Sequence, residues 1–174
     1  MGCIRAIRLT KRRINMQKKL IVVMGINNAG KTFYRQKFLN NYPYVDILEM
    51  QNKYPFITCD LVLKSYYETS NRVLELFENN STVILEHTLL RAVRREEFYF
   101  SVLRNKYPDI EIEVVCITPT LSQYLCNLRN RFTDYPLSYR DIVNYVEMLK
   151  LLEKPTKEEK VEIKLLTANN CNFF

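Results

Sequence analysis

The sequence predicts an α/β domain, a three-layer sandwich whose sheet of about five mostly parallel strands carries helices on both faces. Short apolar runs, such as 20–24 and 112–117, alternate with stretches of helical character. That alternation is typical of parallel strands joined by helical crossovers. The run at 20–24 is also unbroken, as expected of a strand that is buried on both faces. A glycine-containing turn at 25–30 joins the first strand to the first helix.

The first third of the chain opens with a strand at 20–24 and a helix at 31–41, which Pro43 ends. A short strand is expected at 44–48, and a loop follows it through Pro55. This order gives the strand, turn and helix with which such domains begin.

The middle of the chain is predicted to hold a long helix at about 58–78, with Thr58 or Asp60 as its cap. Residues 79–81 read Asn-Asn-Ser and predict a turn. The apolar run that follows is expected to form a buried strand at 82–86.

The remaining elements continue the alternation, and Pro108 and Pro155 mark the ends of two helices. We expect helices at 90–106, 120–131 and 138–153, strands at 112–117 and 161–166, and a loop at 132–137. Ligands bind at the carboxyl ends of such strands. The turn at 25–30 and the segments 86–88 and 118–120 all fall at that edge.

The turn carries the strongest motif, because Gly25, Gly30, Lys31 and Thr32 form the P-loop (Walker A) pattern G-x-x-x-x-G-K-[ST]. In this motif, backbone N–H groups surround phosphate oxygens, the lysine reaches the outer phosphates and the hydroxyl ligates magnesium. We predict that a nucleotide binds to Gly25, Asn27, Asn28, Ala29, Gly30, Lys31, Thr32 and Phe33, and that Thr32 holds Mg²⁺.

One position departs from many kinase P-loops, in which a third glycine is common before the Gly-Lys pair. Here the segment reads Asn28-Ala29. Asparagine is the non-glycine residue that best tolerates a positive φ, so we expect the loop to keep its shape.

Three carboxylates are candidates for magnesium binding or for accepting a proton from a substrate hydroxyl. Asp46 and Glu49 lie beside the second predicted strand, and Glu86 ends the third. The alternative for Asp46 and Glu49 is a solvated loop acid. Glu86 follows three apolar residues of a buried strand, so its carboxylate needs a partner. Beside it, His87 is the only histidine, and it is a candidate near the site.

Two groups of arginines could neutralise charge on a transferred phosphoryl group. Arg91 and Arg95 are spaced with Arg94 so that all three share one helix face, although pairing with neighbouring glutamates is an alternative. Arg129 and Arg131 end a helix before a proline-containing loop, where a mobile lid is expected. A basic helix terminus favoured by the helix dipole is the alternative for this pair.

The composition is that of an ordinary globular protein of 174 residues with 12 tyrosines. No apolar stretch approaches the ~20 residues of a membrane span. The five cysteines are scattered without a C-x-x-C pair, which is typical of reduced thiols, so a cytoplasmic location without membrane contact is expected.

Charge is concentrated at the amino terminus, where the seven basic residues of 1–19 account for the whole net charge of +7. We expect a disordered basic arm at 1–17 and one domain at 18–174. An upstream start before Met16, a contact with nucleic acid or an anionic surface, and lipidation at Gly2-Cys3 are alternatives for the arm.

The order of these motifs resembles the small P-loop kinases that include zeta toxins and polynucleotide kinases, within the P-loop nucleoside triphosphate hydrolase superfamily. The resemblance covers roughly 18–167 and is most specific at the P-loop and at 86–91. It implies ATP and Mg²⁺ at Lys31 and Thr32 and a general base at Asp46. By the same likeness, Glu86 and Arg91 would face the acceptor and Arg129 and Arg131 would be lid arginines.

The expected function is ATP-dependent transfer of a phosphoryl group to a hydroxyl of a small molecule, a nucleoside or nucleotide, or a nucleic-acid end. Lys31, Asp46, Glu86, Arg129 and Arg131 are the predicted catalytic residues, and Glu49, His87, Arg91 and Arg95 are predicted to contact the acceptor. The alternatives are a zeta-toxin-like sugar-nucleotide kinase and a non-catalytic P-loop regulator. The acceptor, ATP or GTP preference, any protein partner and the oligomeric state stay open.

Overall fold

The computed structural model describes residues 17–54, 56, 58–132 and 136–168. The expected arm at 1–17 therefore lies almost entirely outside the described residues. The described strands are β1 (Lys19–Gly25), β2 (Tyr44–Asp46), β3 (Thr82–Thr88), β4 (Glu111–Pro119) and β5 (Glu162–Ala168). The described helices are α1 (Lys31–Phe38), α2 (Ile47–Gln51), α3 (Cys59–Asn79), α4 (Ala92–Arg95), α5 (Ser101–Lys106), α6 (Leu121–Arg131) and α7 (Tyr139–Leu151), with a π-helical segment at Glu96–Phe100 and a 3₁₀ turn at Lys157–Glu159.

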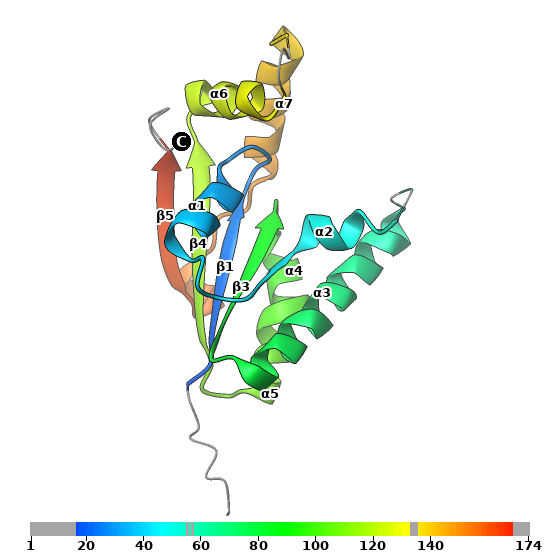
Figure 1. The fold of residues 1–174 in the computed structure, drawn as a ribbon, viewed down its shortest axis with the longest axis vertical. Helices are drawn as coiled ribbons and strands as arrows, with labels where there is room; N and C mark the ends of the chain where they lie inside the picture. The colour runs from blue at the N-terminus through cyan, green and yellow to red at the C-terminus, as the bar shows by residue number, and fades with distance from the viewer. Residues whose placement is uncertain (1–16, 55, 57, 133–135, 169–174) are drawn as a thin grey trace, which may run out of the picture.

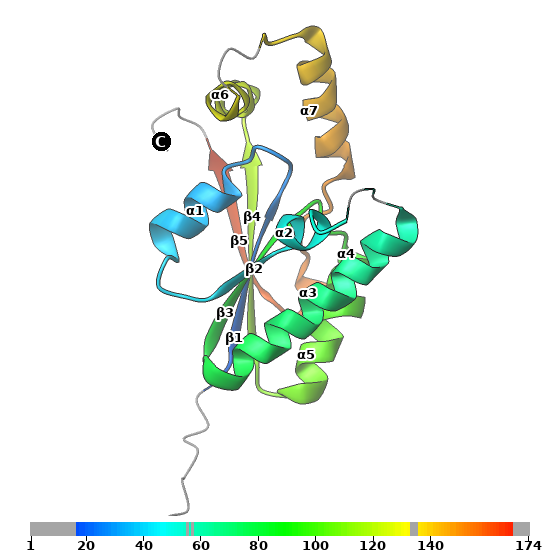
Figure 2. The same ribbon diagram turned by 45° about the vertical axis from the view of Figure 1, so that its right-hand side comes forward.

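The five strands form one parallel sheet in the order β2-β3-β1-β4-β5. Helix α1 covers one face of the sheet, and α3, α4 and α5 cover the other (Figures 1 and 2). The predicted three-layer α/β class with five parallel strands is confirmed. Because β1 lies at the centre, between β3 and β4, the segments that follow these three strands meet at one edge.

Each face of the sheet has its own apolar core, built from alternate residues of the strands. The core on the α3 side contains Leu20, Val22, Val83, Leu85, Val114, Phe77 and Phe100, among other side chains. The core on the α1 side contains Ile21, Val23, Ile84, Val115, Tyr124 and Leu128. The inner strands β1 and β3 are buried on both sides along most of their length, which explains the apolar runs at 20–24 and 83–85.

Local structure differs from prediction in two places. The second strand ends at Asp46 rather than Leu48, because Asp46 caps α2 by accepting a hydrogen bond from the Leu48 N–H. The loop predicted to run through Pro55 therefore contains a helix. The helix predicted at 90–106 begins at Ala92, and its middle is π-helical, which buries the consecutive aromatic residues 98–100.

The long helix α3 has the predicted cap, since the Thr58 hydroxyl accepts from the Leu61 N–H at 3.4 Å. Within the part of the chain that the structure describes, no helix is both long enough and apolar enough to cross a bilayer.

Candidate functional site

The loop between β1 and α1 has the backbone conformation that its sequence predicts. Asn28 and Gly30 are left-handed, with φ of 57° and 89°, so the expectation that Asn28 tolerates a positive φ is confirmed. A Cβ atom at Gly25 would collide with the carbonyl oxygen of Ile117 on β4. Glycine is therefore required there so that the loop can start close to the neighbouring strand.

Lys31 begins α1 and turns its side chain into the loop, where Nζ donates a hydrogen bond to the Ile26 carbonyl at 2.8 Å. The residue is only 6% exposed. Burial lowers the pKa of Lys31 to about 8; the positive charge of Arg131 acts in the same direction, whereas Glu86 and Asp46 oppose the shift. A bound anion beside the amine would raise this pKa again, because an opposite charge favours the protonated form.

Thr32, the next residue, faces the carboxyl end of β3. Its hydroxyl donates to Oε1 of Glu86 at 2.5 Å, and Nε of Arg35 donates to the other carboxylate oxygen at 2.9 Å. The Arg35 guanidinium carbon lies 3.6 Å from the ring centroid of Tyr44 on β2. Both oxygens of the buried Glu86 carboxylate are thus engaged, so the partner predicted for this acid is present.

Asp46 and Glu49 lie on the far side of the loop, at the start of α2. Asp46 uses Oδ1 to cap the helix, at 2.9 Å from the Leu48 nitrogen. Burial raises the pKa of Asp46, with contributions from the charges of Glu86 and Glu49, while the Leu48 N–H and Lys31 oppose the shift. A carboxylate with a raised pKa is a better proton acceptor.

Helix α6 is fastened to the loop by a chain of amides. Nε2 of Gln123 donates to Oδ1 of Asn127 at 2.6 Å, and Nδ2 of Asn127 donates to the Asn28 carbonyl at 2.7 Å. Nη1 of Arg131 donates to Oδ1 of Asn28 at 3.3 Å. Because the Asn28 carbonyl can only accept, it fixes the orientation of both amides.

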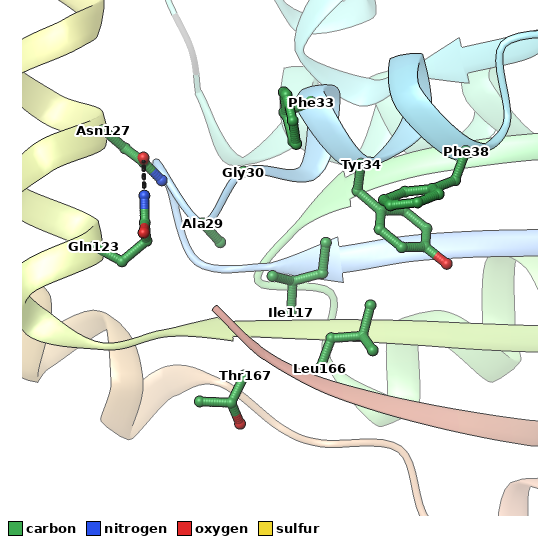
Figure 3. Close-up of a pocket in the computed structure, with 10 residues that line it drawn as sticks. All are labelled: Ala29, Gly30, Phe33, Tyr34, Phe38, Ile117, Gln123, Asn127, Leu166 and Thr167. Carbon is green, nitrogen blue, oxygen red and sulfur yellow. Dashed lines mark hydrogen bonds between the residues drawn. The ribbon is translucent and has the colours of Figure 1, made fainter. Parts of the chain in front are cut away.

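Two adjoining cavities surround the loop. One, of about 450 Å³, lies over the loop and the acids, and it is lined by Asn27, Asn28, Ala29, Gly30, Lys31, Thr32, Phe33, Asp46, Leu48, Glu49, Asn52, Glu86, Asn127 and Arg131. The other, of about 200 Å³, is mostly apolar and is lined by Ala29, Gly30, Phe33, Tyr34, Phe38, Ile117, Gln123, Asn127, Leu166 and Thr167 (Figure 3). The cavities share Ala29, Gly30, Phe33 and Asn127.

The structure brings most of the predicted site residues together. The larger cavity is lined by seven consecutive residues from Asn27 to Phe33, by the acids Asp46, Glu49 and Glu86, and by Arg131. Gly25 lies outside this lining, at the start of the loop, where it packs closely against β4. Arg129 is exposed and is not among the described lining residues. Residues 133–135 of the expected lid lie outside the described residues.

The expectation that Arg91, Arg94 and Arg95 share one helix face is wrong, as the position of Arg95 shows. Its side chain is fully buried and pairs with Glu159, while it also donates to the carbonyls of Leu90 and Glu153. Arg91 is the extended cap before α4, so helical spacing does not apply to it. Its exposed side chain lies near Glu153, with the closest N–O distance at 3.8 Å. In its present position, Arg95 is a structural residue.

His87 points to the opposite face from Glu86, because side chains alternate along β3. Its ring is buried and stacks on Tyr66 with centroids 5.0 Å apart, away from the residues that line the cavity. Burial lowers the pKa of His87 to about 3, although a hydrogen bond with the Thr88 carbonyl opposes the shift. The predicted acceptor contact of His87 gains no support from its position.

Several residues at the site were not anticipated. Arg35 lies one turn after Lys31, and Asn52, Gln123 and Asn127 are contributed by α2 and α6. The spacing of Gln123 and Asn127, four residues apart on a predicted helix that ends in two arginines, is the signal that could have identified them.

Comparisons with known proteins bear on the fold of the chain. No protein-family model matches the chain, and no match was found among curated proteins. Solved structures do match: a proposed kinase from Chloroflexus aurantiacus j-10-fl has a TM-score of 0.67 at 11% identity, with 88% of this chain and 89% of that chain covered. An unliganded sugar kinase from Janibacter sp. HTCC2649 has a TM-score of 0.58 at 14% identity, covering 86% and 85%.

A chain of the Pnkp1/Rnl/Hen1 RNA repair complex also matches, with a TM-score of 0.59 at 15% identity over 88% of this chain and 49% of that chain. At these identities the likeness concerns the fold. The chain resembles P-loop kinases in the architecture of its sheet and helices, as its motifs predicted.

Proposed function

We propose that this protein is an ATP-dependent phosphotransferase that moves the γ-phosphoryl group of Mg-ATP to a hydroxyl of its acceptor. The observation that carries the proposal is a single cavity in which the P-loop, with Lys31 and Thr32, faces the acids Asp46 and Glu86. Phosphoryl transfer needs little more than this positioning and neutralisation of charge. The kinase neighbours of the fold support the same reaction class.

The nucleotide would occupy both cavities. Its phosphates would lie against the loop that contains the left-handed residues Asn28 and Gly30, and against the first turn of α1. Backbone N–H groups and the helix dipole favour anions there. Its base fits the smaller cavity, because the side chains of Phe33, Tyr34 and Ile117 provide apolar walls for a flat ring (Figure 3).

The residues present also fit a magnesium ion bound with the nucleotide. Thr32 donates its hydroxyl proton to Glu86, which leaves the oxygen lone pairs available to a cation. Mg²⁺ is typically held by one or two protein oxygens together with substrate phosphates, whose negative charge it neutralises. Thr32 would hold the ion, and Glu86 would orient Thr32.

Asp46 is the base that this arrangement favours. Both Glu86 oxygens are engaged, whereas Asp46 lines the cavity and has a raised pKa. The acceptor oxygen would form a bond to the γ-phosphorus while the bond from that phosphorus to the ADP oxygen breaks. The acceptor proton would pass to Asp46, and Lys31 and Arg131 would stabilise the charge on the transferred group.

The proposal is tested by measuring ADP release with a panel of hydroxyl acceptors, comprising sugars and polyols, nucleosides, nucleotides and 5′-hydroxyl oligonucleotides. At least one acceptor class should raise ADP release well above the background of a Lys31→Ala variant. If wild-type protein binds Mg-ATP and yet no acceptor raises ADP release above that background, the protein is a nucleotide-binding module.

A further inference from the structure

Arg35 lies beside the site and is held by two contacts, yet the proposed reaction leaves it without a role. It lies three residues after Thr32, so the two side chains share one side of α1. Its Nε atom lies 2.9 Å from Oε2 of Glu86, and the side chains are 12% and 3% exposed. A pair this well shielded is strongly coupled, since an isolated buried carboxylate would be costly.

The position of Arg35 is fixed from its other side. Its guanidinium carbon is 3.6 Å from the centroid of the Tyr44 ring, and the Tyr44 hydroxyl donates to Oε1 of Glu49 at 3.2 Å. Cation–π contact of this kind holds a guanidinium plane in place. The chain of contacts therefore connects α1, β3 and β2 and reaches the acidic side of the cavity.

The contact fixes which way the Glu86 carboxylate turns. With Oε2 bound to Arg35, Oε1 is left toward Thr32 and accepts its hydroxyl proton. The proton on Thr32 is thereby directed at Glu86, so the lone pairs of that oxygen are available to an ion in the cavity. Without the guanidinium, Oε2 of Glu86 would lose the partner that fixes the carboxylate, and the Thr32 hydroxyl would lose its fixed orientation.

We propose that Arg35 is a positioning residue for the magnesium-bound nucleotide, acting through Glu86 on the hydroxyl of Thr32. The inference rests on the proposed function, because it assumes that a magnesium nucleotide binds at the P-loop. Outer partners of metal ligands commonly contribute ten- to hundredfold in metal affinity. Arg35 should therefore affect the gain in nucleotide affinity that Mg²⁺ provides. It should not affect the nucleotide affinity measured without Mg²⁺.

The test measures the affinity for ADP by calorimetry, with Mg²⁺ and with EDTA, in wild type and in Arg35→Gln. We expect Arg35→Gln to reduce the strengthening by Mg²⁺ about tenfold or more. The affinity in EDTA should change by less than about twofold, and Arg35→Lys should restore part of the loss because it keeps the charge. Arg72→Gln, which removes an exposed arginine from a pair on α3, is the matched control.

Tyr44 provides a second route if Arg35→Gln does not fold. Tyr44→Leu removes the ring under the guanidinium and should lower the Mg²⁺ effect about three- to tenfold, whereas Tyr44→Phe keeps the ring and should not. Equal weakening in Mg²⁺ and EDTA, or an unchanged Mg²⁺ effect, would overturn the positioning role and leave the proposed function intact. Failure of the wild type to bind ADP under either condition would overturn both proposals.

Discussion

The lowered pKa of Lys31 makes nucleotide binding a proton-linked event. In the structure the amine is buried against the Ile26 carbonyl and its pKa is about 8. Phosphate oxygens beside the amine would raise that pKa back to the ordinary lysine value of 10.5 or higher, because an opposite charge favours the protonated form. Binding should therefore take up protons at mildly alkaline pH.

The number of protons taken up on binding follows from the pKa of about 8 for Lys31. It implies uptake of about 0.1 proton at pH 7, about 0.5 at pH 8 and about 0.9 at pH 9. The sign follows from the same comparison: the bound state holds more protons, so affinity falls as pH rises. The dissociation constant should increase about fivefold between pH 8 and pH 9.

The assay is calorimetric titration with Mg-ADP at each pH, repeated in buffers of different ionisation enthalpy, whose slope gives the protons taken up. Lys31→Arg is the control, because a guanidinium stays charged throughout this range. Any binding that it retains should show no uptake. Tight binding by the wild type at pH 8 without proton uptake would refute the reasoning, since the amine would then be either already charged or remote from the phosphates.

Three further perturbations test other parts of the structure. Asp46→Asn should lower kcat about 10²–10⁴-fold in the acceptor assay with little change in nucleotide affinity, and a collapse of that affinity would instead assign the residue to the metal site. His87→Phe should remove an acid sensitivity of the wild type, which should lose about 1.5 kcal/mol of unfolding free energy between pH 6.5 and pH 5 in urea titrations. Stability falls with pH because the unfolded chain, in which His87 has its ordinary pKa of 6.5, binds a proton that the folded protein does not bind in this range. An equal loss of unfolding free energy in the wild type and in His87→Phe would contradict this reasoning. Arg95→Met should cost about 3–5 kcal/mol in urea unfolding because it leaves Glu159 without its buried partner. Arg94→Met, at a more exposed neighbour, should change stability by less than about 1 kcal/mol, and similar values for the two would argue against the buried pair.

The architecture and the phosphate loop could be predicted because both are encoded locally. An unbroken apolar run predicts a strand that is buried on two faces. The spacing of the glycines, the lysine and the threonine predicts the backbone conformation of the loop. The positive φ of Asn28 was expected from its residue type together with its place in the loop, where many kinases have glycine. Asp46 and Glu86 could be placed near the loop for the same reason, since each lies in or beside a strand that the sequence predicts, toward the edge where the loop begins.

The contacts across the site could not be predicted, because they join residues far apart in the chain. Nothing in the sequence pairs Arg35 with Glu86, or Asn127 with Asn28. The prediction for Arg95 was wrong for a related reason. Its side chain is buried because it pairs with Glu159, which lies 64 residues further along the chain in the 3₁₀ turn. Periodicity predicts which residues could share a helix face but not which face meets a partner.

Asn28 performs two tasks in a position where glycine would perform one. Its backbone makes the left-handed turn, while its carbonyl and side chain hold Asn127 and Arg131. Two hydrogen bonds from this one residue therefore join helix α6 to the loop at 25–30. A glycine there would keep the left-handed turn and the carbonyl that binds Asn127, but it would lose the contact that holds Arg131 beside the loop.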